Sequence, residues 1–192
     1  KPISNSILSA VLKEKGHDVV QFDTTFMDIG FPLDTDTVKK LKQFKHIDYS
    51  KYKIEVDKSI NPEKAFLEML HKEEPDVIFA STMTDMFPYT CDFLRLAKEA
   101  RSINCVMGGI HPTLNPQECI DTDCIDAVCI GEGEGAIIDY LDHLDGTRLS
   151  NTNIKNLWIK QDGEIYKNPT RPLVEMDSLP FLDYEIYDPR HF

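Results

Sequence analysis

The sequence has no long apolar run and few basic residues. None of its 192 residues lies in a run approaching the roughly 20 apolar residues that a membrane-spanning helix needs. Lysine and arginine number 21 against 33 aspartates and glutamates, so the net charge is −12. Nucleic-acid binding needs a basic face, and an anionic membrane surface repels an acidic protein. We therefore expect neither nucleic acid nor a membrane among the partners.

Cysteine is scarce and has none of the usual metal-binding spacings. The five cysteines are odd in number, mostly lie in apolar surroundings and contain no Cys-x-x-Cys pair: Cys91, Cys105, Cys119, Cys124 and Cys129. An odd set without paired spacing favours reduced thiols in a cytoplasmic protein. We expect them to pack as small buried hydrophobic side chains rather than to hold a metal.

The standard nucleotide-binding and nucleophile motifs are also missing. There is no Gly-x-x-x-x-Gly-Lys-Ser/Thr loop, and no Gly-x-Gly-x-x-Gly follows the first expected strand. No serine or cysteine stands in a context that would pair it with a histidine for nucleophilic catalysis. The sequence itself therefore gives no catalytic residue.

Apolar periodicity predicts alternating helices and strands. Helices are expected over Ser4–Lys15, from Asn61-Pro62 onward, before Arg101, over Pro116–Ile120 and over Glu134–Leu144, with a short one within Thr24–Ile60. Strands are expected at Asp18–Phe22, Asp76–Ala80, Asn104–Gly108 and Asp126–Ile130. Strands separated by helices pair in parallel through right-handed crossovers. The fold class is therefore α/β, a Rossmann-like doubly wound parallel sheet.

The pattern changes near Gly146, which divides the chain into two parts. Residues 1–146 form the α/β domain; because it opens on a helix, we expect a first strand upstream of Lys1. Residues 147–192 are expected to form a hairpin at Asp162-Gly163 and an extended, proline-containing connector. The connector is expected to lead into something else.

Two glycine turns mark the predicted ligand crevice. Gly108-Gly109-Ile110-His111 and Gly131-Glu132-Gly133-Glu134 each follow an apolar strand. Glycine lets the backbone turn sharply and lets a ligand approach without meeting a Cβ. Ligands of open α/β sheets bind outside the carboxyl ends of the strands. We therefore expect a large, flat or extended ligand there.

Each of the other candidate binding residues at these strand ends has two possible roles. The hydroxyls of Ser81, Thr82 and Thr84 would bind a ligand or cap the following helix. His111 would contact a ligand edge or a metal, whereas a loop histidine more often bonds a backbone carbonyl. The acids of the second turn would suit a polar ligand or the dipole of the helix that they begin.

Taken in order, several segments resemble the amino-terminal cobalamin-binding domain of cobalamin-dependent radical SAM enzymes. The matching segments of the domain are Ile7–Val19, Pro75–Ile78, Gly108–Thr113 and Asp126–Glu134. The family's connector into its catalytic barrel resembles Asp162–Ile165, Asn168-Pro169, Arg171-Pro172 and Leu179–Tyr184. The resemblance covers nearly the whole chain.

The resemblance implies a domain that binds cobalamin, a cobalt cofactor, with its nucleotide tail inserted beside the sheet. The positions it assigns to the tail pocket are Ser81, Thr82, Met83, Thr84, Gly108, Gly109, His111, Gly131, Glu132, Gly133 and Glu134. It also implies a radical SAM catalytic domain in cis, which would hold the 4Fe-4S cluster and SAM and would transfer a methyl group or rearrange a substrate.

Two family patterns are absent from this sequence. Without Asp-x-His-x-x-Gly, ligation of cobalt by a histidine is not supported; without Cys-x-x-x-Cys-x-x-Cys, this chain does not itself perform radical SAM chemistry. An alternative is a Rossmann-like module that binds no corrin and docks a substrate or partner. A flavodoxin-like or receiver-like signalling domain would need an acidic cluster after the first strand, a region that the sequence does not contain.

Overall fold

In the computed structural model, which describes residues 3–29 and 57–192, five strands form one sheet in the order β1–β2–β3–β6–β7. The strands are β1 (Val77–Ser81), β2 (Asn104–Gly108), β3 (Ala127–Cys129), β6 (Leu157–Gln161) and β7 (Glu164–Lys167). The pairs β1–β2 and β2–β3 are parallel, whereas β6 runs antiparallel to β3 and β7 antiparallel to β6. The α/β class and the parallel centre of the sheet are therefore confirmed, and the hairpin extends the same sheet.

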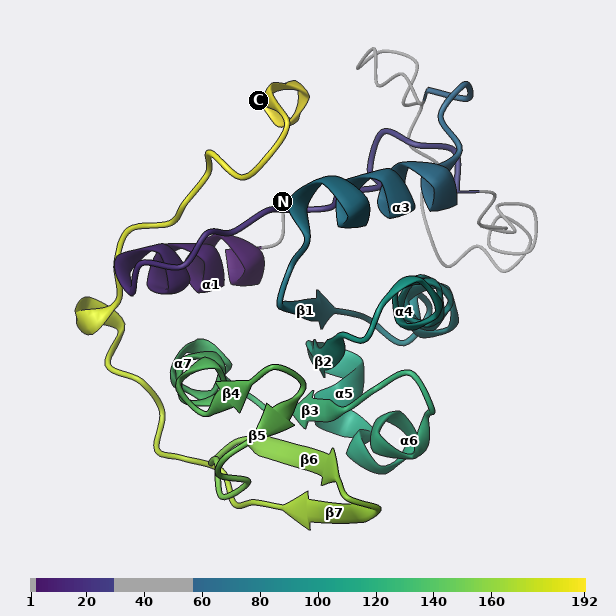
Figure 1. The fold of residues 1–192 in the computed structure, drawn as a ribbon. Helices are drawn as coiled ribbons and strands as arrows, with labels where there is room; N and C mark the ends of the chain where they lie inside the picture. Colours follow the sequence, from purple (N-terminus) through teal and green to yellow (C-terminus); the bar gives the residue numbers. More distant parts are fainter. Residues whose placement is uncertain (1–2, 30–56) are drawn as a thin grey trace, which may run out of the picture.

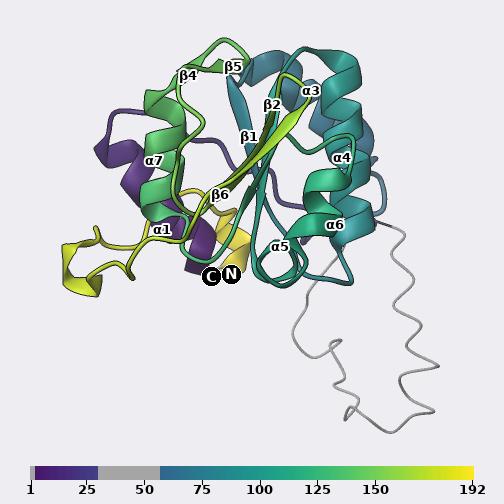
Figure 2. The ribbon, with the colours of Figure 1, turned by 90° about the horizontal axis from the view of Figure 1, so that it is seen from below.

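Helices cover both faces of this sheet. Figures 1 and 2 show α1 and α7 on one face and α4 and α6 on the other, with α3 beside α4; α5 lies at the carboxyl end of β2. Their bounds are α1 (Ile3–Glu14), α3 (Pro62–Glu73), α4 (Phe87–Ala100), α5 (Ile110–Leu114), α6 (Pro116–Asp121) and α7 (Glu134–Asp142). The cap expected for α3 is present, since Asn61 Oδ1 accepts a hydrogen bond from Lys64 N at 2.8 Å. The short helix α5 was not predicted.

Each face of the sheet has its own apolar core. Beneath α3, α4 and α6, the core includes Phe66, Phe93 and Met107. On the α7 face, Val106, Tyr140 and Leu157 belong to the second core. Both faces are buried because consecutive residues of a strand point to opposite sides, which explains the nearly continuous apolar run of β2.

The five cysteines behave as expected for buried hydrophobic side chains. All five are free thiols, and all five are buried. Burial raises the pKa of Cys105 and of Cys129 to about 12. These thiols therefore stay protonated near neutral pH and are unreactive.

The strand expected at Asp18–Phe22 does not form. Residues 17–24 have no regular secondary structure, and within residues 3–29 and 57–192 the edge strand β1 pairs only with β2. Phe22 is nevertheless held in place, with its ring centroid 5.0 Å from that of Phe66 and 5.6 Å from that of Phe93. The prediction was wrong because an apolar pattern places side chains in the core, whereas a strand also needs a neighbouring backbone.

The predicted hairpin is present, and a second one lies beside it. Asp162 and Gly163 both have positive φ, of 55° and 81°, as a two-residue type I′ turn requires. A further small hairpin, not predicted, joins β4 (Leu144–Asp145) to β5 (Arg148–Leu149). The short helix expected within Thr24–Ile60 falls in a segment that lies mostly outside the described residues. Among the helices that the structure describes, none is long and apolar enough to cross a membrane.

The connector returns from β7 to α1. It contains two 3₁₀ helices, η2 (Met176–Ser178) and η3 (Pro189–His191), and passes along α1 in Figure 1. Asp183 fixes it there: its Oδ2 lies 2.7 Å from Lys13 Nζ and accepts a hydrogen bond from Ser9 Oγ at 2.6 Å. Asp183 N also donates to Ser6 O. The end of the chain is thus packed on the first helix.

This attachment is expected to weaken in acid. Burial raises the pKa of Asp183, but hydrogen bonds from Lys13 and Ser9 outweigh it and hold the pKa below its usual 3.8. A carboxyl with a lowered folded-state pKa stabilises the fold above its ordinary pKa, and this contribution disappears as the pH falls through the folded-state value. Asp183→Asn should therefore melt below wild type at pH 7, and the difference between the two melting temperatures should begin to shrink as the pH falls below about 4.

Thermal denaturation followed by circular dichroism from pH 7 to pH 3 measures this difference. Asp177→Asn, at an exposed carboxylate of η2, is the matched control and should follow wild type throughout. A gap between Asp183→Asn and wild type that stays constant down to pH 3 would contradict the assignment.

Candidate functional site

The structure brings the three predicted segments together at one edge of the sheet. Ser81, at the end of β1, is in register with Gly108, at the end of β2, and Thr82 N donates to Gly108 O at 3.0 Å. The turn that begins at Gly131 follows β3, the parallel neighbour of β2. The carboxyl ends of parallel strands are where open α/β sheets bind ligands, so the two turns are placed as the sequence predicts.

Thr113 joins the two glycine turns. Its Oγ1 donates to Gly109 O at 2.8 Å and accepts from Gly131 N at 3.1 Å. One hydroxyl thus uses its donor on the first turn and a lone pair on the second. Sequence reasoning missed this role, because 18 residues separate Thr113 from Gly131 and only the folded sheet brings them together.

The two positive-φ glycines of the turns have different surroundings. At Gly109, with φ of 105°, an added Cβ would lie 2.6 Å from Thr82 O and 2.9 Å from Thr82 N. Glycine is therefore required at position 109, because any Cβ would clash with the backbone of Thr82. At Gly131, with φ of 78°, an added Cβ would meet no atom within 4 Å. Gly131 is therefore exposed and open on the side where a Cβ would lie.

The hydroxyl residues after β1 do not cap α4. The N-cap of α4 is Met86, and no side chain makes a capping hydrogen bond there, so the capping interpretation is wrong. Thr82 is buried, and its Oγ1 donates to Met83 O and lies 3.0 Å from Thr90 Oγ1. Ser81, the last residue of β1, and Thr84 are both exposed.

His111 is packed inside the protein at the start of α5. It is 2% exposed, its ring centroid lies 4.3 Å from that of Phe87, and its Nδ1 lies 3.2 Å from Thr84 Oγ1. On its other side, Nε2 makes no hydrogen bond but lies 3.5 Å from Glu118 Oε2. This environment holds the ring against a hydroxyl, an aromatic ring and a carboxylate, rather than against a backbone carbonyl.

The two glutamates of the second turn differ in their contacts. Glu132 Oε2 accepts a hydrogen bond from Val174 N at 2.8 Å, so its carboxylate holds the connector. Glu134 is in the first turn of α7, where a carboxylate suits the helix dipole, and its Oε2 is buried without a hydrogen-bond partner. Gly133 faces α1, since an added Cβ would lie 3.4 Å from Leu8 Cδ2.

Apolar side chains are exposed on the elements that follow these strand ends. Met83 is 53% exposed after β1, and Ile110 and Leu114 of α5 are 61% and 70% exposed. Hydroxyls, backbone amides and exposed apolar groups together fit a large ligand with both polar and apolar surface. They do not form a set of metal ligands.

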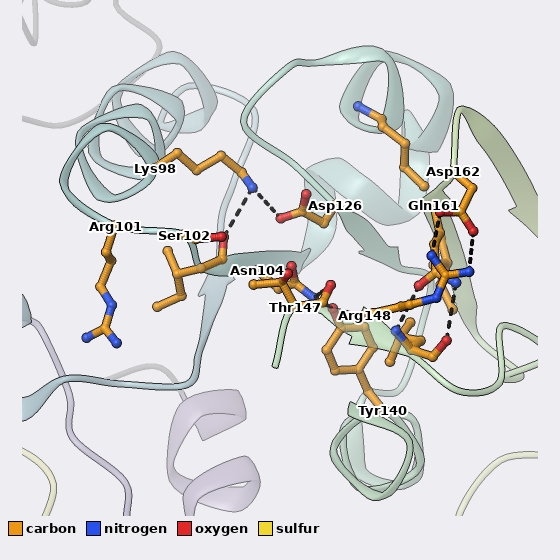
Figure 3. A pocket seen from close by; sticks show the side chains of 14 residues that line it. Lys98, Arg101, Ser102, Asn104, Asp126, Tyr140, Thr147, Arg148, Gln161 and Asp162 are labelled. Carbon is orange, nitrogen blue, oxygen red and sulfur yellow. Dashed lines mark hydrogen bonds and ion pairs between the residues drawn. The ribbon is translucent and has the colours of Figure 1, made fainter. Parts of the chain in front are cut away.

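A cavity of about 470 Å³ lies at the opposite end of the sheet, where β2 begins and β6 ends (Figure 3). Lys98 Nζ lies 2.7 Å from Asp126 Oδ2, and Arg148 makes two hydrogen bonds to Asp162. Beneath them, Asn104 Nδ2 donates to Tyr140 Oη at 2.9 Å. These paired charges join α4 to the residue before β3, and β5 to the turn between β6 and β7.

Much of the chain is similar to known proteins. The family model of the B12 binding domain matches residues 1–141. An uncharacterized methyltransferase of Pyrococcus horikoshii is 33% identical over 126 residues, which is 62% of this chain and 26% of that protein. The anaerobic magnesium-protoporphyrin IX monomethyl ester cyclase of Rubrivivax gelatinosus is 30% identical over 107 residues, 53% of this chain and 19% of that protein. The chain thus spans about a quarter or less of these relatives.

A solved structure has the same fold. The radical S-adenosylmethionine methyltransferase TsrM of Kitasatospora setae superposes with a TM-score of 0.61 at 12% identity. The match covers 88% of this chain and 27% of TsrM. At this low identity the similarity establishes the fold alone.

Proposed function

The chain belongs to the family of B12-binding domains, and from this premise we propose that it holds cobalamin at the carboxyl edge of β1, β2 and β3. The observation that carries the proposal is the open space at Gly131, beside a turn that Thr113 ties to the first glycine turn. A nucleotide tail needs room beside the strand ends, next to small residues and hydroxyls.

The residues present fit this ligand. Ser81 and Thr84 would offer hydroxyls to the tail, and the glycines of the two turns would let it approach the backbone. His111 would support Thr84, because its Nδ1 already faces that hydroxyl at 3.2 Å. When bound, cobalamin supplies cobalt chemistry for methyl transfer or rearrangement; this chain's own residues bind and orient it.

We further propose that the chain is the cofactor-binding part of a radical SAM enzyme of the cytoplasm. The supporting observations are the relatives, of which the matches span about a quarter or less, and the connector, which leaves the sheet after β7 and has exposed apolar residues. Phe181 is 100% exposed, and Leu173 is 82% exposed. A catalytic domain in cis, holding the 4Fe-4S cluster and SAM, would cover these side chains.

Titration with hydroxocobalamin, followed in the visible spectrum, tests the function. We expect saturable binding with one cobalamin per chain and a spectrum without imidazole ligation, because the ring of His111 is buried against Phe87. Cobinamide, which lacks the nucleotide tail, is the matched ligand and should bind at least about tenfold more weakly, a difference of about 1.4 kcal/mol.

The same titration separates the alternatives. Equal affinity for cobinamide and hydroxocobalamin would remove the tail pocket from the proposal. If hydroxocobalamin causes no spectral change in folded protein, a substrate-docking or interaction module without corrin becomes the better explanation.

A further inference from the structure

Asn156 joins the second crevice turn to the connector. It is 3% exposed and has a φ of 70°, a left-handed conformation that asparagine tolerates better than most residues. Its backbone already links two segments: Ile130 N donates to Asn156 O at 2.8 Å, and Asn156 N donates to Pro169 O at 3.0 Å. The residue therefore lies between the end of β3 and the start of the connector.

The side-chain amide of Asn156 also joins the crevice turn to the connector, one polar atom bonding each segment. Nδ2 donates to Glu132 O at 2.6 Å, within the crevice turn. Oδ1 accepts from Arg171 N at 2.7 Å, within the connector. A buried amide with a partner on each side holds both backbones in fixed positions, since losing either partner leaves a buried polar group unsatisfied.

Two further contacts join the same two segments. Glu132 Oε2 accepts from Val174 N at 2.8 Å, so the turn also binds the connector through its own side chain. Arg171 Nη2 lies 2.7 Å from Asp139 Oδ2 on α7, and the guanidinium of Arg171 covers Gly135. The turn, the first part of α7 and residues 169–174 therefore form one hydrogen-bonded unit.

We propose that Asn156 is a positioning residue for cobalamin, and that cobalamin binding and order in the connector are coupled through it. The inference rests on the proposed function. The crevice turn is open to a ligand at Gly131, and one residue later its backbone is fixed by Asn156. A ligand that orders the turn thereby orders the connector, and linkage makes the effect reciprocal.

The first measurement is hydroxocobalamin affinity in side-chain variants. Asn156→Gly removes the amide and keeps the left-handed backbone accessible, so the loss of the side chain is isolated from backbone strain. We expect its Kd to rise about 5- to 20-fold, within the usual range of coupling between sites. Asn156→Asp keeps an acceptor for Arg171 N but loses the donor to Glu132 O, and it should weaken binding as well.

Arg171→Ala tests the contact between the connector and α7. Arg171 contacts Asp139 and covers Gly135, and it makes no hydrogen bond to the crevice turn, so direct ligand contact does not explain a weaker Kd in this variant. We expect a rise of about 5-fold. Asn153→Gly, at an exposed asparagine of the same loop, is the matched control and should bind as wild type does. Circular dichroism confirms folding in each case.

Hydrogen exchange of the connector supplies the reciprocal measurement. The amides of Arg171 and Val174 donate to Asn156 and Glu132, so their exchange reports whether the unit is closed. Hydroxocobalamin should slow their exchange in wild type and leave it almost unchanged in Asn156→Gly. The inference fails if wild type binds hydroxocobalamin but folded Asn156→Gly binds equally well. It also fails if hydroxocobalamin does not change the exchange rates of these two amides in wild type. Wild type that binds no hydroxocobalamin overturns the proposed function as well.

Discussion

Replacing Gly109 with alanine is expected to lower the melting temperature by about 6–12 °C, a loss of about 3 kcal/mol. Gly109 has φ of 105° and ψ of −165°, a conformation essentially restricted to glycine. The new Cβ would also lie 2.6 Å from Thr82 O, so the backbone after β1 must move. The effect is therefore mainly on the fold.

Gly131→Ala is the informative counterpart. Its φ of 78° adds strain of about 1–2 kcal/mol, but its Cβ would meet no protein atom within 4 Å. If the cobalamin tail passes there, the added methyl group should raise the Kd for hydroxocobalamin about tenfold or more. Gly163→Ala is the matched control, because its φ of 81° and open surroundings are similar but it lies in the β6–β7 hairpin.

Thermal melts and hydroxocobalamin titrations of the three variants decide between these roles. We expect Gly109→Ala to lose the most stability, Gly131→Ala to lose affinity with moderate destabilisation, and Gly163→Ala to lose only stability. If Gly131→Ala binds hydroxocobalamin as tightly as Gly163→Ala does, the cobalamin tail does not pass this turn. A Gly109→Ala protein as stable as wild type would refute the close approach to Thr82.

Elements determined by local sequence were predicted well. The periodic apolar face of α1, the asparagine cap of α3 and the Asp162-Gly163 turn depend on residues within a few positions of one another. The three strand ends of the crevice were also predicted, since apolar runs ending in glycine or hydroxyl residues mark where parallel strands stop.

The features that the sequence did not predict depend on distant contacts. Thr113 bridges turns that are far apart along the chain, and the amide of Asn156 bonds residues 24 positions before it and 15 after it. Helix α5 has only five residues and contains Pro112, so periodicity has too few positions to reveal it. Strand pairing also places the backbone of Thr82 on the side of Gly109 where a Cβ would lie, so that side does not face a ligand.

The segment at Asp18–Phe22 is a predicted strand that does not form, again because the outcome depends on distant contacts. Of its apolar residues, Phe22 packs on the core whereas Val20 is 55% exposed. Strand formation depends on a partner backbone, and the apolar pattern says nothing about one. Phe22 instead joins an aromatic cluster with Phe66 and Phe93, in which the Phe66 and Phe93 centroids lie 5.1 Å apart in an edge-to-face arrangement. Side-chain packing, and not a hydrogen-bonded ladder, holds this segment on α3 and α4.

Phe93→Ala is therefore expected to be among the most destabilising single substitutions in this chain. Phe93 is buried on α4 and contacts the rings of Phe22, Phe66 and Tyr89. Removing a buried phenylalanine ring costs about 3–5 kcal/mol, because transfer energy is lost and a cavity remains. Residues 17–24, which have no ladder of their own, should lose their attachment first.

Urea denaturation and hydrogen exchange test this expectation together. Phe181→Ala makes the same chemical change at a ring that is 100% exposed, and it should alter the free energy of unfolding by less than about 0.5 kcal/mol. In Phe93→Ala, exchange of the amides of α3, whose Phe66 packs against the Phe93 ring, should accelerate more than that of β2, which also contributes Val106 to the core on the other face. Equal acceleration in both regions would mean that the two cores unfold as one unit.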